Sequence, residues 1–389
     1  MNKKVKFTTR LLTFMLAVVL LAAALPSKPA QAAVMGIDVS KYQGIINWQQ
    51  VKASGVNFAF IRIGSTQKGL DPYFAINMNG AISAGIKTGV YIYSYATNAV
   101  EAQAEAAFAL AAIEPYPVSM PVVIDIENSV HKLLNPIQNA DIVNNFCSVI
   151  DAAGYYPMVY SNKYLYTNKI APVGWDMWVA QYGDSCDVPA AIWQATDKGR
   201  IGGIAGNVDI DYLYKDYSKL IVANGFVAKA QGLRYYENYK LVRNRFVQNG
   251  GFTYYIDANG FRILNCFYPV GDGVYYLDAE GRMQTGLFNV GADSCYAAPD
   301  GKLLTGFVDL GGQTFYFDPA SFAMKKGFTQ TDRGVCYFDE NTGAQIKGIA
   351  TIGNDIYYFD DITGVMKTGA IDFGGTVFTF DPATGKLVQ

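Results

Sequence analysis

The 389-residue sequence predicts an α/β barrel followed by an all-β array of stacked hairpins. Two observations support this prediction. In the first half of the chain, short apolar runs alternate with helical patterns, which is typical of strands joined by helices. In the second half, pairs of aromatic residues recur every 19 to 21 residues, which is typical of a repeat array.

Residues 1–32 have the features of a signal peptide. Basic residues precede an apolar run, Leu11–Leu25, that is short for a membrane span, and Ala30-Gln31-Ala32 fits a cleavage site. The alternative is an uncleaved membrane anchor. We expect cleavage, a mature chain that starts near Ala33, and secretion from the cell.

Cleavage would change the charge balance of the chain. The segment holds five basic and no acidic residues, so the mature chain keeps 26 basic and 33 acidic residues, a formal charge of −7. Such a chain lacks the basic surface that nucleic-acid binding requires. No later segment is apolar enough to span a bilayer, so we expect no membrane contact after cleavage.

Residues 33–216 are expected to form the barrel. Eight runs have the composition of strands: Gly36–Ser40, Asn57–Gly64, Thr88–Tyr95, Pro121–Glu127, Tyr156–Ser161, Asp176–Tyr182, Ala191–Ala195 and Val208–Tyr212. Helical patterns follow the first five: Trp48–Ala53, Pro72–Ala84, Val100–Ile113, Asn139–Ala153 and Lys163–Lys169. This order indicates a parallel sheet, and eight strands suggest closure into a barrel whose second half lacks helices. The alternative, an open doubly wound sheet, would want a glycine-rich loop after the first strand, and the sequence has none there.

Residues 232–389 are expected to form the array, with residues 217–231 as a linker. The aromatic pairs or their equivalents begin at positions 235, 254, 275, 295, 315, 336, 357 and 378. Most pairs are followed by an aspartate and a glycine-containing turn, which indicates one β-hairpin in each repeat. A single hairpin cannot bury its own apolar face, so neighbouring hairpins must stack into a solenoid.

Histidine and cysteine usage restricts the chemistry. His131 is the only histidine, so a His-rich catalytic metal site is excluded, and the residue itself is expected in a polar loop. The five cysteines show no C-x-x-C spacing, which argues against a zinc site; a Cys147–Cys186 disulfide is conceivable but not determined by the sequence. We therefore expect neither a metal nor a cofactor, and any catalysis must be carried out by carboxylates.

Four carboxylates stand at predicted strand ends. Asp125 and Glu127 follow an apolar run at positions i and i+2, so they share one face of the strand. Two carboxyl groups so close raise each other's proton affinity, which can keep one protonated as a general acid. The alternative is a turn-capping aspartate beside a solvated glutamate. Asp38 and Asp209 stand near the ends of the first and last strands, which are neighbours in a closed barrel.

The first half of the sequence resembles a known family. The resemblance is carried, in order, by Gly36-Ile-Asp-Val-Ser-Lys-Tyr-Gln-Gly, Asp125-Ile-Glu127, Trp178-Val-Ala-Gln-Tyr, Ile192-Trp-Gln and Gly206-Asn-Val-Asp-Ile-Asp. Residues 35–216 resemble glycoside hydrolase family 25, the Chalaropsis-type lysozymes, which cleave the β-1,4 bond between N-acetylmuramic acid and N-acetylglucosamine in peptidoglycan. The fold of that family, an irregular TIM-like (β/α)5β3 barrel, agrees with the strand count.

The resemblance implies a role for each of the four carboxylates. Glu127 matches the general acid, and Asp125 matches the acid that acts either as nucleophile or by orienting the acetamido oxygen of the substrate. Asp38 and Asp209 match the other two carboxylates at the barrel mouth. The i, i+2 spacing is compatible with a retaining geometry, but inverting and substrate-assisted mechanisms stay open.

The resemblance also implies residues that line the cleft. These substrate-binding positions are Tyr91, Tyr93, Tyr160 and Trp178. Asp211 stands where the family more often has asparagine, which adds a charge near the site.

The repeats resemble the cell-wall-binding (choline-binding) repeats of Gram-positive bacteria. Choline is held in aromatic cages in which tryptophan is the best ring, and this region has no tryptophan. The ligand therefore stays open between teichoic acid, another wall polymer and a glycan, and a spacer role is the alternative. We expect peptidoglycan as the partner of the barrel, and a wall-associated or extracellular location.

Two functions follow from this sequence. The first is a secreted muramidase that the repeats direct to the wall. The second is a wall- or glycan-binding protein whose barrel holds a glycan without cutting it. The presence of all four carboxylates favours the first function.

Overall fold

The computed structural model describes residues 34–388 as two compact units, which divide between Val242 and Arg243. The predicted signal peptide lies outside the described residues. In the first unit, eight strands close into a barrel: β1 (Val34–Val39), β2 (Phe58–Ser65), β4 (Lys87–Tyr93), β5 (Val122–Asp125), β6 (Pro157–Asn162), β7 (Asp176–Ala180), β8 (Ile192–Gly199) and β9 (Val208–Leu213). The barrel closes because β1 pairs with both β2 and β9. A two-residue strand, β3 (Gly69–Leu70), pairs with the end of β2.

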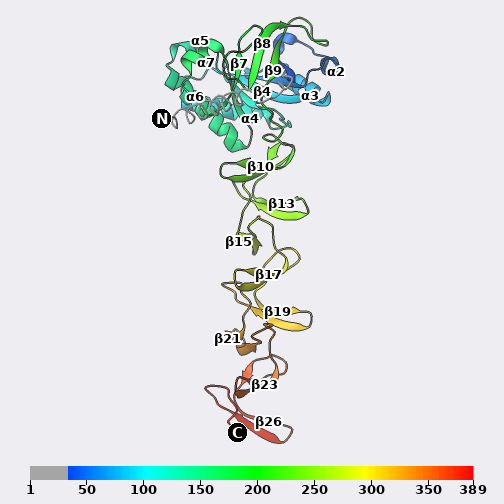
Figure 1. Ribbon diagram of the computed structural model, residues 1–389, viewed down its shortest axis with the longest axis vertical. Helices are drawn as coiled ribbons and strands as arrows, with labels where there is room; N and C mark the ends of the chain where they lie inside the picture. The colour runs from blue at the N-terminus through cyan, green and yellow to red at the C-terminus, as the bar shows by residue number, and fades with distance from the viewer. Residues whose placement is uncertain (1–33, 389) are drawn as a thin grey trace, which may run out of the picture. The chain divides into compact units, whose positions relative to one another are not determined.

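Helices lie in the connections of the N-terminal part of the barrel. They are η1 (Lys41–Gln43), α2 (Trp48–Ala53), α3 (Phe74–Ser83), α4 (Ala99–Ile113), α5 (Ser129–Leu133), α6 (Pro136–Ala153) and α7 (Lys163–Lys169). Helices α5, α6 and α7 lie together on one side of the barrel (Figure 1). Within the described residues, the connections from β7 to β8 and from β8 to β9 hold no helix.

The direction of the last strand differs from the prediction. The first seven barrel strands run parallel, but β9 runs antiparallel to both β8 and β1, so a wholly parallel sheet was a wrong expectation. The connection before β9 spans only residues 200–207, which is shorter than the helix-free connection of residues 181–191 that returns β8 parallel to β7. A parallel return requires a longer crossover than an antiparallel one. Residue Asp209 near the start of β9 therefore lies at the same end of the barrel as Asp38 near the end of β1, with which it is in register.

The helix boundaries follow from local capping. The Asn98 side chain accepts a hydrogen bond from the Glu101 amide and starts α4 close to the predicted position. Helix α6 starts three residues before the predicted Asn139, because Asn135 forms a capping box with Gln138 and a proline occupies the first turn. It ends at Gly154, whose φ of 102° is a left-handed conformation that favours glycine.

Apolar side chains fill two layers. One layer lies between the strands and the helices, and it includes most of the buried residues of α2, α3, α4 and α6. The other fills the barrel interior with Phe58, Phe60, Tyr160 and Trp178, and it forms a floor beneath the carboxyl ends of the parallel strands. Gly89 leaves room for the Phe60 ring, because a Cβ at this position would lie 2.4 Å from that ring.

The predicted position of His131 is wrong. It lies in α5 rather than in a polar loop, its side chain is fully buried, and its Nε2 lies 3.2 Å from the carbonyl oxygen of Ala96. Burial lowers the pKa of His131 to about 4, so the ring is neutral and structural at physiological pH.

The five cysteines are all unpaired, so Cys147 and Cys186 do not form a disulfide in this structure.

Residues 217–231, which were expected to form a linker, contain a strand. This strand, β10 (Asn224–Lys229), pairs with β11 (Gly232–Glu237), and β12 (Lys240–Leu241) adds to the same sheet. Lys229 and Arg234 of this sheet form ion pairs with Asp151 near the end of α6. The first hairpin thus packs against the barrel and belongs to the first unit.

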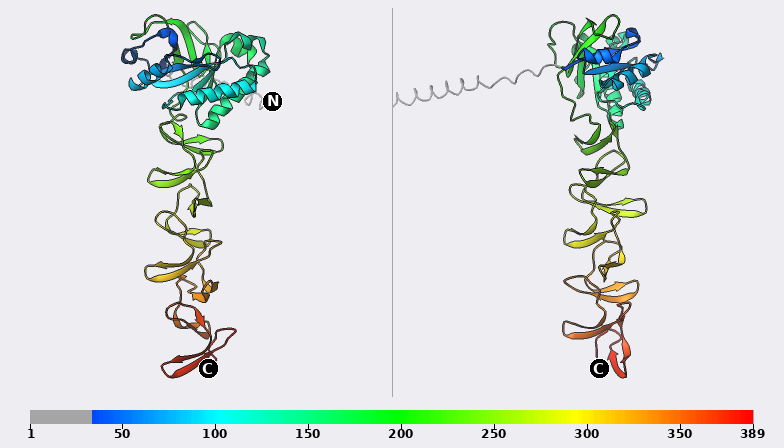
Figure 2. Two further views of the ribbon diagram at one scale, coloured as in Figure 1. Left: turned by 180° about the vertical axis from the view of Figure 1, so that it is seen from behind. Right: turned by 90° about the vertical axis from the view of Figure 1, so that its right-hand side faces the viewer.

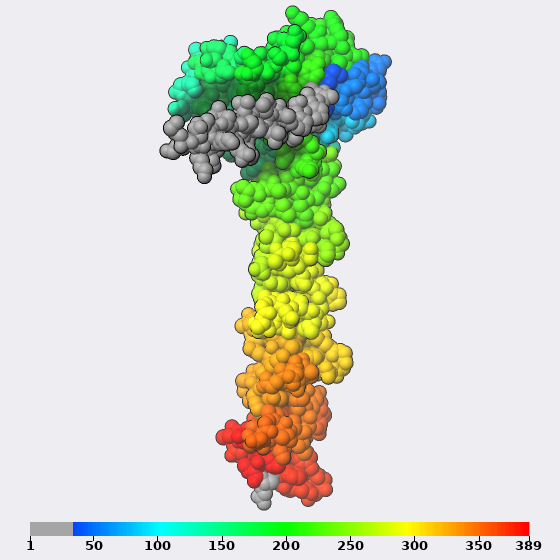
Figure 3. All heavy atoms as spheres, viewed as in Figure 1, coloured from blue at the N-terminus to red at the C-terminus, as the bar shows by residue number. Residues whose placement is uncertain are grey.

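The second unit consists of seven small antiparallel hairpins. Their paired strands are β13–β14 (Arg245–Asn249, Phe252–Ile256), β15–β16 (Cys266–Val270, Gly273–Leu277), β17–β18 (Gly286–Val290, Asp293–Ala297), β19–β20 (Gly306–Leu310, Gln313–Phe317), β21–β22 (Gly327–Thr331, Gly334–Phe338), β23–β24 (Gly348–Ile352, Asp355–Phe359, with β25 at Met366–Lys367) and β26–β27 (Gly369–Phe373, Thr376–Phe380). Successive hairpins follow one another through this unit (Figure 2), and neighbouring repeats are in contact along it (Figure 3).

Backbone hydrogen bonds join the stacked hairpins. The amide of Met283 donates to the carbonyl of Thr253, and the amide of Leu303 donates to that of Val274, at 2.8 and 2.9 Å. Each bond connects the segment after one hairpin to the strand of the hairpin before it. The core of the stack is formed by a phenylalanine that recurs at one position of successive repeats and is at most 1% exposed: Phe317, Phe338, Phe359 and Phe380.

Among the described residues of the whole chain, no helix is both long and apolar enough to cross a membrane.

Candidate active site

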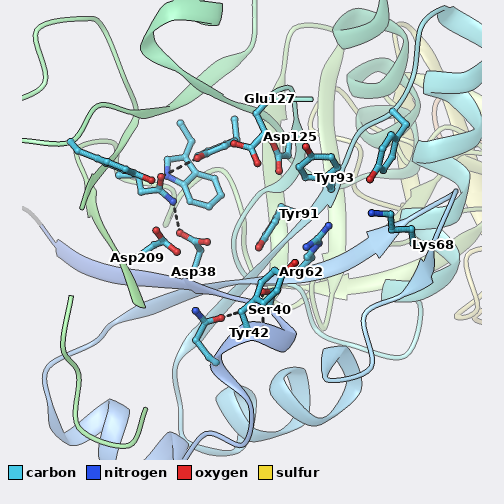
Figure 4. A pocket seen from close by; sticks show the side chains of 16 residues that line it. Asp38, Ser40, Tyr42, Arg62, Lys68, Tyr91, Tyr93, Asp125, Glu127 and Asp209 are labelled. Atoms are coloured by element: carbon cyan, nitrogen blue, oxygen red, sulfur yellow. Dashed lines mark hydrogen bonds between the residues drawn. The ribbon is translucent and has the colours of Figure 1, made fainter. Parts of the chain in front are cut away.

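A cavity of about 420 Å³ opens at the end of the barrel where the parallel strands finish. It is lined by all eight of the predicted site residues: Asp38, Asp125, Glu127, Asp209, Tyr91, Tyr93, Tyr160 and Trp178. Figure 4 shows that Asp38 and Asp209 lie side by side on one wall, with Asp125 and Glu127 on another and Tyr91 between the two pairs. The barrel therefore brings together side chains from β1, β4, β5, β6, β7 and β9.

The wall with Asp38 is held by a chain of hydrogen bonds. Tyr160 donates from its hydroxyl to Oε1 of Gln194 at 2.9 Å, and Nε2 of Gln194 donates to Oδ2 of Asp38 at 2.7 Å. Burial, together with the charges of Asp211 and Asp209, raises the pKa of Asp38 well above its usual range. Burial and the charge of Asp197 raise the pKa of Asp209 to about 6. This wall is therefore fixed in position and rich in carboxyl groups that hold their protons tightly.

The Asp125 carboxyl group lies at the end of β5 and is 2% exposed. Its Oδ1 atom is buried without a hydrogen-bond partner within the described part of the chain. Burial, followed by the charge of Glu127, raises the pKa of Asp125 well above its usual range, although Arg62 acts in the opposite direction. The turn-capping alternative does not fit, because Asn128 is the residue that caps α5.

Glu127 follows Asp125 by two residues and borders the cavity. Burial raises the pKa of Glu127, while Arg62 and Lys132 lower it. A carboxyl group with a raised pKa next to an open cavity can donate a proton at neutral pH. Asp125 lies directly beside Glu127. Two neighbouring carboxyl groups can act as a general acid and a second carboxylate in the cleavage of a polar bond.

Aromatic side chains make the floor and one side of the cavity. The Trp178 ring is 1% exposed and packs against Tyr160 and Tyr91, with ring centroids 4.7 and 6.2 Å apart. Tyr93 also lines the cavity, and the guanidinium of Arg62 lies 5.2 Å from the centre of its ring. The partly exposed rings of Tyr91 and Tyr93 can contact the apolar face of a sugar, whereas the Trp178 ring has almost no exposed surface for such a contact.

The cavity is also lined by eight residues that the sequence analysis did not assign: Ser40, Tyr42, Gln43, Arg62, Lys68, Tyr95, Tyr182 and Gln194. A signal existed for Arg62, because it is the one charged residue inside the apolar strand Phe58–Ser65. Gln194 lay within a quoted segment, but only the fold shows that its side chain joins two walls of the cavity.

Asp211 lies beneath the cavity wall, and its carboxyl group is buried there. Its side chain is fully buried, its Oδ1 accepts a bond from Nε1 of Trp178 at 2.8 Å, and its Oδ2 has no partner among residues 34–388. Burial raises the pKa of Asp211 well above its usual range, although the bond from Trp178 lowers it. The folded barrel must therefore either hold a buried charge at pH 7 or take up a proton.

We expect Asp211→Asn to stabilise the barrel by about 1–3 kcal/mol at pH 7, because the amide keeps the acceptor for Trp178 without a charge. Because the pKa of Asp211 is raised in the folded state, its protonated form contributes to the stability of the fold at low pH. This contribution to stability is lost as the pH rises through the folded-state pKa. The advantage of the variant should therefore shrink towards pH 4, where the aspartate is protonated in the unfolded chain as well. Thermal unfolding of both proteins between pH 4 and 8 measures this, and an equal advantage at every pH would contradict it.

Comparisons with known proteins give consistent matches for the barrel. Residues 37–204 match the model of the family described as glycosyl hydrolases family 25. The uncharacterized protein YegX of Escherichia coli O6:H1 is 29% identical over 216 residues, which cover 52% of this chain and 74% of that protein. Lysozyme M1 of Streptomyces globisporus is 30% identical over 196 residues (45% of this chain and 66% of that protein). The autolytic lysozyme of Clostridium acetobutylicum is 26% identical over 213 residues (54% and 63%).

Two solved structures are also similar. The modular autolysin LytC of Streptococcus pneumoniae matches with a TM-score of 0.43 and 28% identity, over 48% of each chain. A lysozyme of Streptomyces coelicolor matches with a TM-score of 0.42 and 27% identity, over 49% of this chain and 96% of that chain. Both TM-scores are below 0.5, so these likenesses carry no functional assignment.

Proposed function

Because residues 37–204 form a glycosyl hydrolase family 25 domain and the protein is a glycoside hydrolase, we propose that it is a secreted lysozyme of the muramidase type. It hydrolyses the β-1,4 bond between N-acetylmuramic acid and N-acetylglucosamine in peptidoglycan. The observation that carries this proposal is the meeting of Asp38, Asp125, Glu127 and Asp209 around one cavity. Four buried or half-buried acids in one place cost folding free energy, which a catalytic role would explain.

In the proposed mechanism, Glu127 is the general acid. Burial raises the pKa of Glu127, which favours the protonated form that can donate a proton to the glycosidic oxygen of the leaving sugar. The positive charge that develops on the remaining sugar ring is stabilised by Asp125, which acts as nucleophile or orients the acetamido oxygen of the substrate. Asp38 and Asp209 position the reacting sugar from the opposite wall.

We also propose that the repeats hold the enzyme at the cell wall. Exposed rings on the hairpins, such as Phe252 and Phe328, each 46% exposed, can stack on a wall polymer. The guanidinium of Arg333 lies 4.0 Å from the centre of the Phe307 ring, and that of Arg282 lies 4.4 Å from the centre of Phe252. Since Phe252 and Phe307 already contact a cation of the chain itself, teichoic acid or a glycan is a better candidate than choline for the repeats.

Product analysis tests the proposed activity. Purified peptidoglycan is incubated with the protein, and the new reducing ends are reduced with borohydride and identified by mass spectrometry. We expect reduced N-acetylmuramic acid at the new ends. Reduced N-acetylglucosamine would assign cleavage of the other glycosidic bond, and the absence of new ends on several wall types would leave the protein as a wall-binding module.

A further inference from the structure

A second cavity, of about 650 Å³, lies outside the barrel next to the proposed active site. It is lined by four aromatic residues and by polar residues of the β7–β8 and β8–β9 segments: Tyr182, Trp193, Tyr212, Tyr214, Gly183, Asp184, Ala195, Thr196, Asp197 and Lys198. Tyr182 also lines the proposed active site, so this residue borders both cavities. We call the second cavity the outer groove.

The outer groove exists because no helix covers this part of the barrel. Side chains alternate along a strand, and Gln194 and Asp211 point inward to Asp38 and Trp178. Their neighbours Trp193 and Tyr212 therefore point outward, and their rings lie 5.5 Å apart across the paired strands. Between β7 and β9, the described chain has no helix that could pack on these rings.

The aromatic residues of the groove differ in exposure. Trp193 is 6% exposed, and its Nε1 donates to the carbonyl oxygen of Gln181 at 2.7 Å, so its ring is fixed in the groove wall. Tyr182 and Tyr214 are 56% and 54% exposed and present free ring faces at different points of the groove. Asp184 and Asp197 supply carboxylates beside the rings. Rings with neighbouring hydrogen-bonding groups match a polymer of sugar rings, which are apolar on their faces and hydroxylated at their edges.

We propose that the outer groove is an additional binding subsite for the glycan strand whose adjacent sugars occupy the active site. The inference rests on the proposed function, because it assigns the same polymer to both cavities. Because Tyr182 borders both cavities, a strand that passes this residue can reach from the active site to Tyr214. The groove raises the affinity of the enzyme for long strands over short ones.

Tryptophan fluorescence can measure binding to the barrel alone. All four tryptophans, Trp48, Trp175, Trp178 and Trp193, lie in the barrel, so ligand bound only to the repeats leaves them without a contact. The full-length protein carries Glu127→Gln so that the ligand stays intact. The probes are peptide-free glycan strands of peptidoglycan and the disaccharide of N-acetylglucosamine and N-acetylmuramic acid.

We expect Tyr214→Ala to weaken the binding of long strands about threefold to tenfold and to leave the binding of the disaccharide unchanged. Tyr214→Phe should restore most of the affinity, since it keeps the ring. The matched control is Tyr164→Ala, because Tyr164 is 56% exposed, close to the 54% of Tyr214, but lies on α7 outside both cavities. Circular dichroism confirms that each variant is folded.

Equal affinities of Tyr214→Ala and Tyr164→Ala for long strands would overturn the subsite. An equal loss for strands and disaccharide would overturn it too, because the residue would then act through the active site. Failure of the proposed function is distinguishable, since it appears as missing reducing ends with the wild-type protein, whereas this test measures binding without catalysis.

Discussion

Replacement of Glu127 by glutamine is expected to lower the release of reducing ends from peptidoglycan about 10²- to 10⁴-fold. The amide has nearly the size and shape of the carboxyl group, but it cannot transfer a proton to the glycosidic oxygen. Burial raises the pKa of Glu127, which is the property that a proton donor at neutral pH needs. The rate is measured with purified peptidoglycan under saturating and limiting substrate, which separates kcat from KM.

The effect should fall on kcat, with KM little changed, because the lost proton transfer belongs to the transition state. Glu114→Gln is the matched control, since Glu114 is in the same domain but its side chain is 74% exposed and pairs only with surface Lys240. A Glu127→Gln variant that keeps most of its activity would show that another group donates the proton. A variant that loses binding as well would point to a structural role.

Replacement of Asp125 by asparagine is expected to lower the activity and to raise the stability of the protein. Activity should fall about 10²-fold or more, because an amide stabilises the positive charge of the transition state far less than a carboxylate. Stability at pH 7 should rise by about 1–3 kcal/mol, because Asp125 is 2% exposed and its Oδ1 has no hydrogen-bond partner among the described residues. A residue whose role is structural would lower stability and activity together when it is replaced.

The pH dependence of this stabilisation has a defined sign. Burial and the charge of Glu127 raise the pKa of Asp125, so the protonated form favours the folded state at low pH and this contribution is lost as the pH rises. The advantage of the asparagine variant should therefore be large at pH 7 and small near pH 4. Thermal unfolding over this range checks the prediction. A variant that is less stable than the wild type at pH 7 would contradict it.

The sequence predicts the barrel well where side-chain patterns report on local structure. The apolar runs predict eight strands because the interior layer and the helix-facing layer both bury them, and α2 and α7 have their predicted bounds. The strand ends also place Asp38 and Asp125 at one rim. The direction of β9 was missed, because its alternating pattern is the same in either direction and only its pairing with β1 and β8 reveals it.

Other features depend on contacts between distant segments. The polar residues around His131 predict a loop. Its burial instead results from the packing of α5 against the segment that carries Ala96. The bridge made by Gln194 joins Tyr160 to Asp38, and no local pattern encodes it. The strand β10 lies inside the predicted linker, because the aromatic pair of the first repeat stands on β11. Only the pairing of β10 with β11 shows that both strands belong to one hairpin.

The pairing of β1 with β9 has a consequence for the order in which the molecule forms. β1 meets β2 soon after both are made, but it meets β9 only after all the intervening chain has been arranged. Contacts between residues distant in sequence form slowly, since a long loop must be closed before they stabilise anything. The hairpins of the second unit need only short loops and can form early. Because Asp38 and Asp209 face each other across this pairing, the candidate active-site cavity is complete only after β1 and β9 have paired.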